Sequence, residues 1–220
     1  RMSDYLDDVV CLERFDTLEE FYECAYGFGN FQRMLSDFPV DTLYETIPNF
    51  HNTPLRFERF MEVVEKDPLG RAEEVMDEIE FFISEKKFYS VLFDANKDGS
   101  LPIRVTHNDT KTNNVMLDKD TRKAVRVIDL DTVMPGFSVN DFGDAIRFAA
   151  NFVSEDCSDY DKVGVNLDVF RCFAQGFLEM TAKTGGALNY TSGSMSAAGT
   201  IIQKEEGVAD SVEDYVADIL

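Results

Sequence analysis

Side chains that can do chemistry are concentrated in one short stretch in the middle of the chain. The stretch reads HNDTKTNN from His107 to Asn114, and a polar segment separates it from VIDLD, which ends at Asp131. Apolar runs on both sides of that polar segment give it the composition of a hairpin loop. If the two runs pair antiparallel, the residue before the first run lies beside the residues after the second. We therefore expect Asn114 to lie close to Asp129.

The oxygen atoms of this stretch suit a hard cation. In an extended strand Asp129 and Asp131 point to the same face, because side chains alternate along a strand. With Asn114 nearby, their oxygen atoms would converge. Mg²⁺ prefers oxygen ligands, keeps several waters and bridges to phosphate groups. The sequence therefore predicts a magnesium site made by Asn114, Asp129 and Asp131.

The order of these groups along the chain fits phosphoryl transfer. Asp109 lies five residues before Asn114, which is the spacing of the kinase catalytic loop, where the Asp accepts the proton of the acceptor hydroxyl and the Asn binds a metal ion. Lys111 could neutralise charge on the migrating phosphoryl group, since most catalytic work in this reaction is positioning and electrostatics. Asp129 takes the place of the metal-binding Asp of the kinase D-F-G motif.

The wider sequence resembles one family of small-molecule kinases. The segments HNDTKTNNVMLD, VIDLDTVMPG and NDFGDAIRF, with FGNFQ and ETIPNFHNTP upstream, are similar to the aminoglycoside/choline phosphotransferase family. Within it they are most similar to sugar kinases of the N-acetylhexosamine 1-kinase type. The likeness runs from about Phe15 to Phe177. It implies an α+β fold, that of a protein kinase-like C-terminal lobe, which is mostly helical with a small antiparallel β-hairpin at the catalytic loop.

The resemblance also implies roles for single residues. Asp109 would be the catalytic base, with Lys111 beside it. Asn114 and Asp129 would bind Mg²⁺ and, through it, ATP as the co-substrate. Asp131 would be a second metal ligand or a carboxylate on the substrate side.

Two further residues are expected to support the catalytic loop. His107 would orient it, and Asp141 would be a buried acid that accepts hydrogen bonds from its backbone. Each has a structural alternative. His107 could be an ordinary hydrogen-bonded histidine, and Asp141, like Asp144, opens an apolar-periodic helix where the helix dipole favours acids. For Asp144 we prefer the dipole explanation.

A turn-rich loop from Ile47 to Thr53 holds the candidates for acceptor binding. The resemblance places this loop in the acceptor half of the molecule, so His51 and Asn52 are possible lining residues of a sugar pocket. The alternative is a loop that only leads into a helix, because Thr53-Pro54 begins one with proline at its first position.

Helices must position these loops. A capping box at Thr17–Glu20 begins a helix that continues to about Ser36. Another begins at Thr53, and apolar stripes indicate two more at Arg71–Lys87 and Asp168–Lys183. Helices, a small sheet and then more helices are what the kinase-like lobe requires.

The expected organisation is one lobe followed by a tail. We assign residues 1–184 to the catalytic lobe and residues 185–220 to a divergent or truncated acidic tail, because Gly, Ser and Thr interrupt the helical pattern there. Upstream of Asp109 there is no Gly-rich phosphate loop and no strand-borne lysine. We therefore expect the N-terminal lobe to be absent, and this chain alone to bind nucleotide poorly.

Composition narrows the choice of partners. The formal net charge of −21 disfavours nucleic-acid binding, which requires lysine and arginine. Four cysteines without a paired spacing, together with two histidines, make a zinc site improbable. Without a long apolar run or a signal peptide we expect a cytoplasmic protein that does not enter membranes.

The sequence thus predicts an ATP- and Mg²⁺-dependent enzyme that phosphorylates a hydroxyl group of a small molecule. A hexosamine-type sugar is the first choice of acceptor, and an aminoglycoside, choline or another amino alcohol is the second. The alternative of a different class is a catalytically silent lobe that serves as a binding or structural module.

Overall fold

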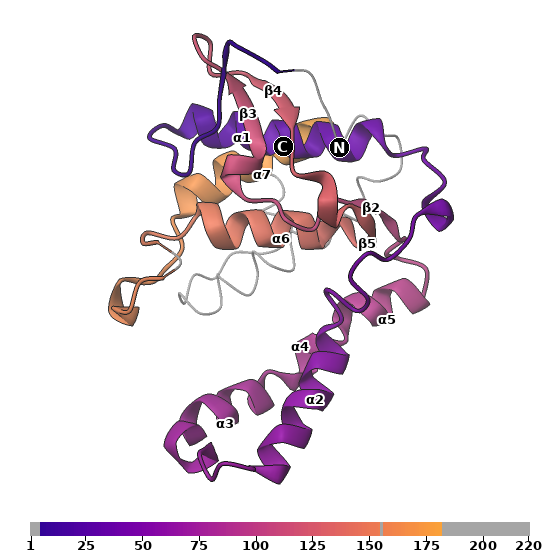
Figure 1. The fold of residues 1–220 in the computed structure, drawn as a ribbon, viewed down its shortest axis with the longest axis vertical. Coiled ribbons are helices and arrows are strands. Elements are labelled where there is room, and N and C mark those ends of the chain that lie inside the picture. Colours follow the sequence, from indigo (N-terminus) through magenta and orange to yellow (C-terminus); the bar gives the residue numbers. More distant parts are fainter. Residues whose placement is uncertain (1–4, 155, 182–220) are drawn as a thin grey trace, which may run out of the picture. The chain divides into compact units, whose positions relative to one another are not determined.

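The computed structural model describes residues 5–154 and 156–181. The chain divides into two compact units (Figure 1). The first combines residues 1–46 with residues 104–220, and the second is the intervening segment 47–103. The expected tail at residues 185–220 lies outside the described residues.

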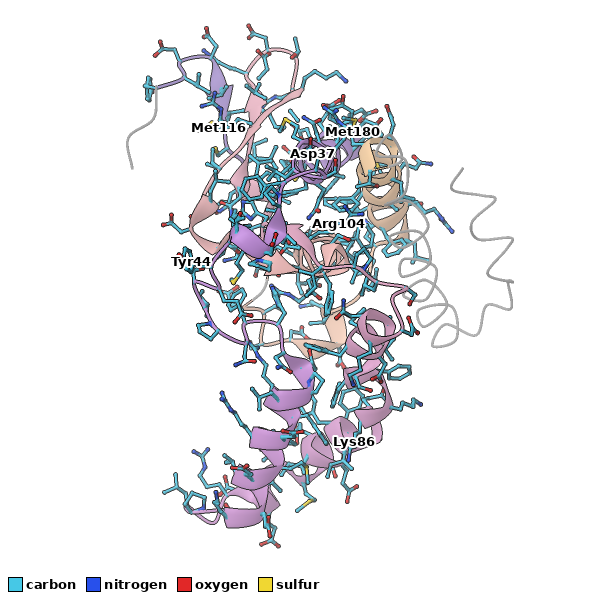
Figure 2. All side chains as sticks on the ribbon, turned by 90° about the vertical axis from the view of Figure 1, so that its right-hand side faces the viewer. Asp37, Tyr44, Lys86, Arg104, Met116 and Met180 are labelled. Atoms are coloured by element: carbon cyan, nitrogen blue, oxygen red, sulfur yellow. The ribbon has the colours of Figure 1, made fainter. Side chains whose placement is uncertain are left out.

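The first unit contains short strands, α-helices and short 3-10 helices. Its strands are β1 (Val9–Val10), β2 (Arg104–Thr106), β3 (Val115–Asp118), β4 (Ala124–Val127) and β5 (Met134–Gly136). Its helices are α1 (Leu18–Met34), α6 (Ser138–Ala149) and α7 (Leu167–Thr181), with short 3-10 helices η1 (Val40–Thr42), η3 (Thr112–Asn114), η4 (Leu130–Thr132) and η5 (Tyr160–Lys162). Figure 2 shows the side chains of this unit crowding between the hairpin that carries Met116 and the helix that carries Met180.

The strands form two small antiparallel sheets. One has the order β1-β3-β4, and the other pairs β2 with β5. In the hairpin, Val115 lies opposite Val127, and the N–H of Ile128 donates to the carbonyl of Asn114 at 2.9 Å. This is the antiparallel pairing that the two apolar runs predicted, and it places the chain before β3 beside the chain after β4.

Helix α1 begins where the capping signal predicted. The hydroxyl of Thr17 accepts the N–H of Glu20 at 3.3 Å, and the Glu20 carboxylate accepts the N–H of Asp16 at 3.0 Å. These two bonds satisfy backbone donors that a helix N-terminus leaves free. The N-terminal end of the helix is thereby fixed.

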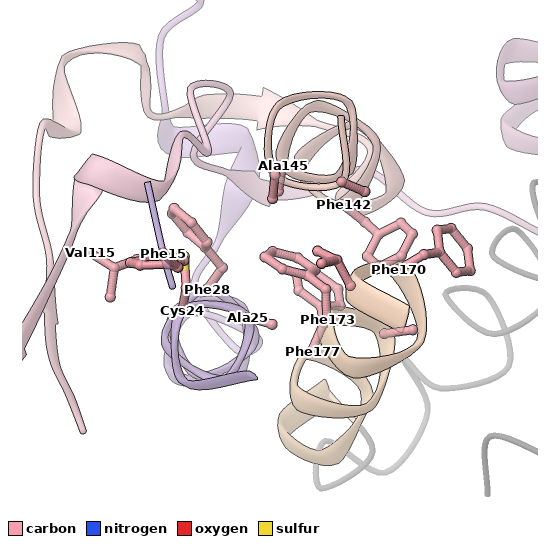
Figure 3. Packing of buried hydrophobic residues seen from close by; sticks show 14 of the residues in the cluster. Phe15, Cys24, Ala25, Phe28, Val115, Phe142, Ala145, Phe170, Phe173 and Phe177 are labelled. Atoms are coloured by element: carbon pink, nitrogen blue, oxygen red, sulfur yellow. The ribbon is translucent and has the colours of Figure 1, made fainter. Parts of the chain in front are cut away.

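The core of the first unit lies between α1, α6 and α7. Phe142 of α6 meets Phe170, Phe173 and Phe177 of α7 with ring centroids 5.6 to 6.0 Å apart, and Phe28 of α1 completes the cluster (Figure 3). Aromatic pairs of this kind contribute about 0.5–1.5 kcal/mol each beyond the burial of their area. The predicted apolar faces of these helices are therefore the buried ones.

Glycine allows α1 and α7 to approach closely. A Cβ atom added at Gly176 would lie 2.4 Å from the carbonyl oxygen of Tyr22, and one added at Gly29 would lie 2.5 Å from the carbonyl oxygen of Phe177. Each helix therefore uses a glycine at the point where the backbone of the other passes.

The second unit is helical. Its elements are α2 (Thr53–Lys66), η2 (Ala72–Val75), α3 (Met76–Ser84), α4 (Lys86–Tyr89) and α5 (Val91–Lys97). Phe57 of α2 packs on Tyr89 at 5.0 Å between ring centroids, and Phe60 packs on Phe82 at 5.7 Å. The single helix expected at Arg71–Lys87 is wrong, because this segment is divided into the 3-10 helix η2 and the two helices α3 and α4, which are separated at Glu85.

The described residues combine helices with small antiparallel sheets, so the expected α+β class is confirmed. The last predicted helix, Asp168–Lys183, is found as α7 up to Thr181, and its last two residues lie outside the described residues. Within the described part of the chain, no helix has both the length and the apolar character needed to cross a membrane.

Candidate functional site

The polar residues singled out from the sequence lie in the segment 107–114, which connects β2 to β3. Asp141 on the first turn of α6 fixes the beginning of this segment. One of its carboxylate oxygens accepts the N–H of His107 at 2.9 Å, and the other accepts the N–H of Asn108 at 2.8 Å. Gln32 of α1 donates its side-chain amide to the same carboxylate. Asp141 therefore connects α1, α6 and the loop through hydrogen bonds, and the helix dipole alone does not explain its position.

Burial makes Asp141 an unusual acid. The side chain is 1% exposed, and this burial raises its pKa to about 6. The hydrogen bonds from His107, Asn108 and Gln32 act in the opposite direction, because they favour the charged form.

His107 joins the loop to the end of the hairpin. Its Nδ1 accepts the N–H of Asp109 at 3.3 Å, and its Nε2 lies 2.8 Å from the carbonyl oxygen of Ile128. Since one ring nitrogen accepts, the other carries the proton, which identifies the neutral Nε2–H tautomer. The ring is fully buried and meets Phe28 and Phe31 edge-on. The hydrogen bond from the N–H of Asp109 to the His107 ring is therefore compatible with the expected orienting role of His107.

Asp109, Lys111 and Asn114 lie together. The side-chain amide of Asn114 donates to the carbonyl oxygen of Asp109 at 2.8 Å and lies 3.3 Å from its Oδ2. The ammonium group of Lys111 is 3.4 Å from Oδ1 of Asp109, and both side chains are partly open to solvent. The loop therefore presents a carboxylate, an ammonium group and an amide at one place.

Asp129 follows the hairpin directly but is not in a strand. Strand β4 ends at Val127, and Asp129 adopts a left-handed conformation with φ 58° and ψ 60°. Asp131 lies in the 3-10 helix that follows. The expectation that Asp129 and Asp131 share the face of one extended strand is therefore wrong. Aspartate is among the few residue types other than glycine that adopt this backbone conformation readily, so the strand can end there.

Asn108, on the loop, is a second residue with a left-handed backbone conformation. Asn108 has φ 67°, and its side-chain amide donates to the carbonyl oxygen of Thr132 at 2.9 Å. The hydroxyl of Thr132 in turn donates to the carbonyl oxygen of His107 at 2.7 Å. This reciprocal pair ties the loop to the segment that carries Asp129 and Asp131. Backbone conformations of this rare kind often occur at functional sites, where the surroundings hold them.

Sequence reasoning missed several residues that hold the loop. Gln32 was quoted only within the FGNFQ segment and given no role, although a polar residue on the apolar face of a helix signals a buried partner. Thr110 and Thr132 carried no signal in the pattern. Asp144 was assigned to the helix dipole, but its carboxylate accepts the N–H of Thr110 at 2.9 Å.

His51 and Asn52 belong to the second unit. Asn52 caps α2, because its side-chain oxygen accepts the N–H of Leu55 at 3.1 Å, and its amide donates to the side chain of Asn49 at 2.9 Å. His51 is half-buried against the ring of Phe50. The helix-leading alternative thus describes Asn52 well, while an acceptor-binding role for either residue stays a prediction.

The site differs in composition from a metal centre of acids and histidines. Among residues 5–154 and 156–181, no group of three or more His, Cys, Asp or Glu side chains is spaced to hold one metal ion. The expected magnesium ligands combine the amide of Asn114 with carboxylates.

Part of the chain matches a model of a known protein family. The model described as the phosphotransferase enzyme family matches residues 13–164, which is more than half of the chain and includes α1, the loop 107–114 and α6. The family expected from the sequence motifs is confirmed, whereas the particular likeness to sugar kinases stays a prediction. The chain belongs to the phosphotransferase enzyme family.

Proposed function

We propose that this chain is the part of a kinase that transfers the γ-phosphoryl group of ATP, with Mg²⁺, to a hydroxyl group of a small molecule. The observation that carries the proposal is the grouping of Asp109, Lys111 and Asn114 on one loop whose backbone is held by Asp141. In phosphoryl transfer the protein contributes mainly positioning and charge, and this loop offers both.

Asp109 is the proposed base. Its carboxylate accepts the proton of the acceptor hydroxyl while the hydroxyl oxygen forms a bond to the γ-phosphorus atom. The bond from that phosphorus to the bridging oxygen breaks, and ADP leaves with the electron pair. Asp109 is suited to this role because Asn114 holds its backbone carbonyl and its side chain stays partly open to solvent.

Lys111 brings a positive charge to the same place. Its ammonium group lies beside the Asp109 carboxylate, where the oxygen atoms of the transferred group would pass. A fixed positive charge stabilises the negative charge that spreads over these oxygen atoms in the transition state.

Asn114 and Asp129 are the proposed holders of Mg²⁺, with Asp131 as a further carboxylate. The donor set fits this ion, since Asn114 uses its amide nitrogen on Asp109 and keeps its amide oxygen for a cation. A Mg²⁺ ion held by these residues would supply positive charge that neutralises the phosphate oxygens. The ties between Asn108, Thr132 and His107 hold the two ligand-bearing segments side by side.

A hexosamine-type sugar is the proposed acceptor, which rests on the resemblance of the motifs. An amino alcohol or aminoglycoside is the second candidate. The net charge of −21 favours this alternative in one respect, because an acidic protein attracts a cationic acceptor.

The test is an ATP-consumption screen of the protein over N-acetylhexosamines, aminoglycosides and choline. We expect Asp109→Asn to lower kcat by about 10²-fold or more with the best acceptor, because the amide cannot take up the proton. Asp120→Asn, in the exposed hairpin turn, is the matched control and should leave kcat unchanged. Equal kcat in wild type and Asp109→Asn would remove Asp109 from the role of base.

A further inference from the structure

Helix α6 carries a second acid that contacts the loop. Asp144 stands three residues after Asp141, and this spacing places both acids on one face of the helix. Oδ2 of Asp144 accepts the N–H of Thr110 at 2.9 Å and lies 3.3 Å from its hydroxyl oxygen. The hydroxyl proton has a nearer acceptor in the carbonyl oxygen of Asp141, at 2.6 Å. The amide of Thr110 is therefore the main link between Asp144 and the loop.

The contact with Asp144 completes a run of hydrogen bonds from backbone N–H groups of the loop to side chains. The N–H groups of residues 107 and 108 donate to Asp141, that of Asp109 donates to the ring of His107, and that of Thr110 donates to Asp144. Four consecutive backbone donors are thus bound to side chains. Asp109 lies third in this series, so its backbone is held on both sides.

The arrangement of Asp144 differs from that of a surface ion pair. Its other oxygen, Oδ1, pairs with Arg147 at 3.2 Å, but the side chain of Asp144 is only 19% exposed, against 53% for Arg147. A surface pair at this spacing contributes little to stability. A charge-assisted hydrogen bond to a buried residue contributes more, and Thr110 is fully buried.

We propose that Asp144 is a positioning residue, which fixes the Thr110 peptide and thereby the orientation of the Asp109 carboxylate. Its consequence for turnover rests on the proposed function. The effect passes from Thr110 to Asp109 and on to Asn114, whose side-chain amide is bonded to Asp109. Two acids one helical turn apart, Asp141 and Asp144, then hold the two ends of the series.

The test replaces Asp144 with alanine and with asparagine in the full chain. NMR should show the amide of Thr110 exchanging its hydrogen about tenfold faster or more in Asp144→Ala, because its charged acceptor is lost. The side-chain amide signals of Asn114 should shift as Asp109 moves. Asp144→Asn keeps an acceptor oxygen and should restore most of both signals. With the best acceptor, kcat should fall about tenfold in Asp144→Ala while KM for ATP changes little.

Asp168→Ala is the matched control. Asp168 forms the same kind of pair with an arginine three residues later, on α7, so its loss should leave the Thr110 and Asn114 signals unchanged. Unchanged Thr110 exchange or an unmoved Asn114 signal in Asp144→Ala would overturn the proposal, as would an unchanged kcat. If the wild type phosphorylates no acceptor, the proposed function fails instead, and the two NMR signals still decide whether Asp144 positions Asp109.

Discussion

Two opposing effects act on the pKa of Asp141. Its burial favours the neutral acid, while donors from His107, Asn108 and Gln32 favour the carboxylate. Burial is the larger effect, so the pKa rises to about 6. The carboxyl group that holds the loop therefore changes its charge in the mildly acidic range.

The raised pKa has a consequence for stability. The folded protein binds a proton at Asp141 between about pH 4 and pH 6, where the unfolded chain has released it. This contribution is complete below about pH 4 and is lost as pH rises through about 6. Asp141→Asn should lack it. The excess stability of the wild type over Asp141→Asn, measured by urea unfolding, should be about 1 kcal/mol larger near pH 5 than near pH 7.5.

Asp118 in the hairpin turn provides a contrast of opposite sign. The N–H and hydroxyl groups of Thr121 donate to its carboxylate and lower its pKa. Its contribution to stability is therefore present at neutral pH and lost as pH falls below the usual range for aspartate. Asp118→Asn should thus cost less stability in acid than at neutral pH.

For Asp141 the opposite trend is decisive. If the free energy of unfolding of the wild type exceeded that of Asp141→Asn by an amount that grows with pH, the assignment at Asp141 would be contradicted.

At this scale the sequence predicted that Asp109 and Asn114 would share one loop, but not how the backbone of that loop would be held. The spacing of Asp109 and Asn114 indicated one loop, and their side chains are in contact. The left-handed turn at Asp129 could not be predicted, because an aspartate after an apolar run fits an extended strand equally well. The contact between Asp144 and Thr110 depends on how α6 packs, which a single sequence does not show.

Among the elements, α1 and α7 depend most on a close approach. The two helices meet at Gly29 and Gly176, and their backbones come near enough to exclude a methyl group at either position. Side chains of the shared core, such as Phe28 and Phe173, fill the space beside this contact. The packing of α7 is therefore sensitive to a single added carbon.

Gly176→Ala should destabilise the protein by about 1–3 kcal/mol, because its Cβ would collide with the backbone of α1 and force the helices apart. Gly143→Ala on α6 is the matched control. Apart from its chain neighbours and the nearby backbone of its own helix, nothing lies within 4 Å of the Cβ it would add, so the better helix propensity of alanine should stabilise the protein by about 0.5–1 kcal/mol. Urea unfolding of both variants measures the difference, and equal effects of the two substitutions would refute the close approach.

Helix starts were more predictable than helix continuity. Thr17 and Asn52–Pro54 carry local capping signals, and both helices begin there. The apolar stripe at Arg71–Lys87 runs through three separate helical segments. Apolar periodicity indicates which face of a helix is buried, but it does not indicate where the backbone hydrogen bonding is interrupted. The extent of the tail beyond α7 stays a prediction.

The whole molecule carries a large negative net charge. The chain carries 42 acidic and 21 basic side chains. At least half of the acidic side chains therefore have no basic counterpart, and their excess negative charge causes mutual repulsion across the surface.

Salt should therefore stabilise this protein. We expect the Tm to rise by several degrees between about 0.02 M and about 0.5 M NaCl, because screening weakens repulsion in the compact state. KCl should give the same rise, which separates screening from the binding of a particular ion. A Tm that falls with added NaCl would show that attractive pairs outweigh the repulsion.

The separation of the first unit into two pieces of sequence has a consequence for how the protein is made. Helix α1 is synthesised before its main packing partner, α7, which follows only after the whole segment 47–103 and the hairpin. A ribosome adds about 5–20 residues per second, so the apolar face of α1 waits uncovered for roughly ten seconds. Meanwhile the inserted helices can assemble from their own short-range contacts. The nascent chain should thus depend on chaperones most strongly during this interval, and substitutions that delay the arrival of α7 should lower its yield in cells before they alter the finished fold.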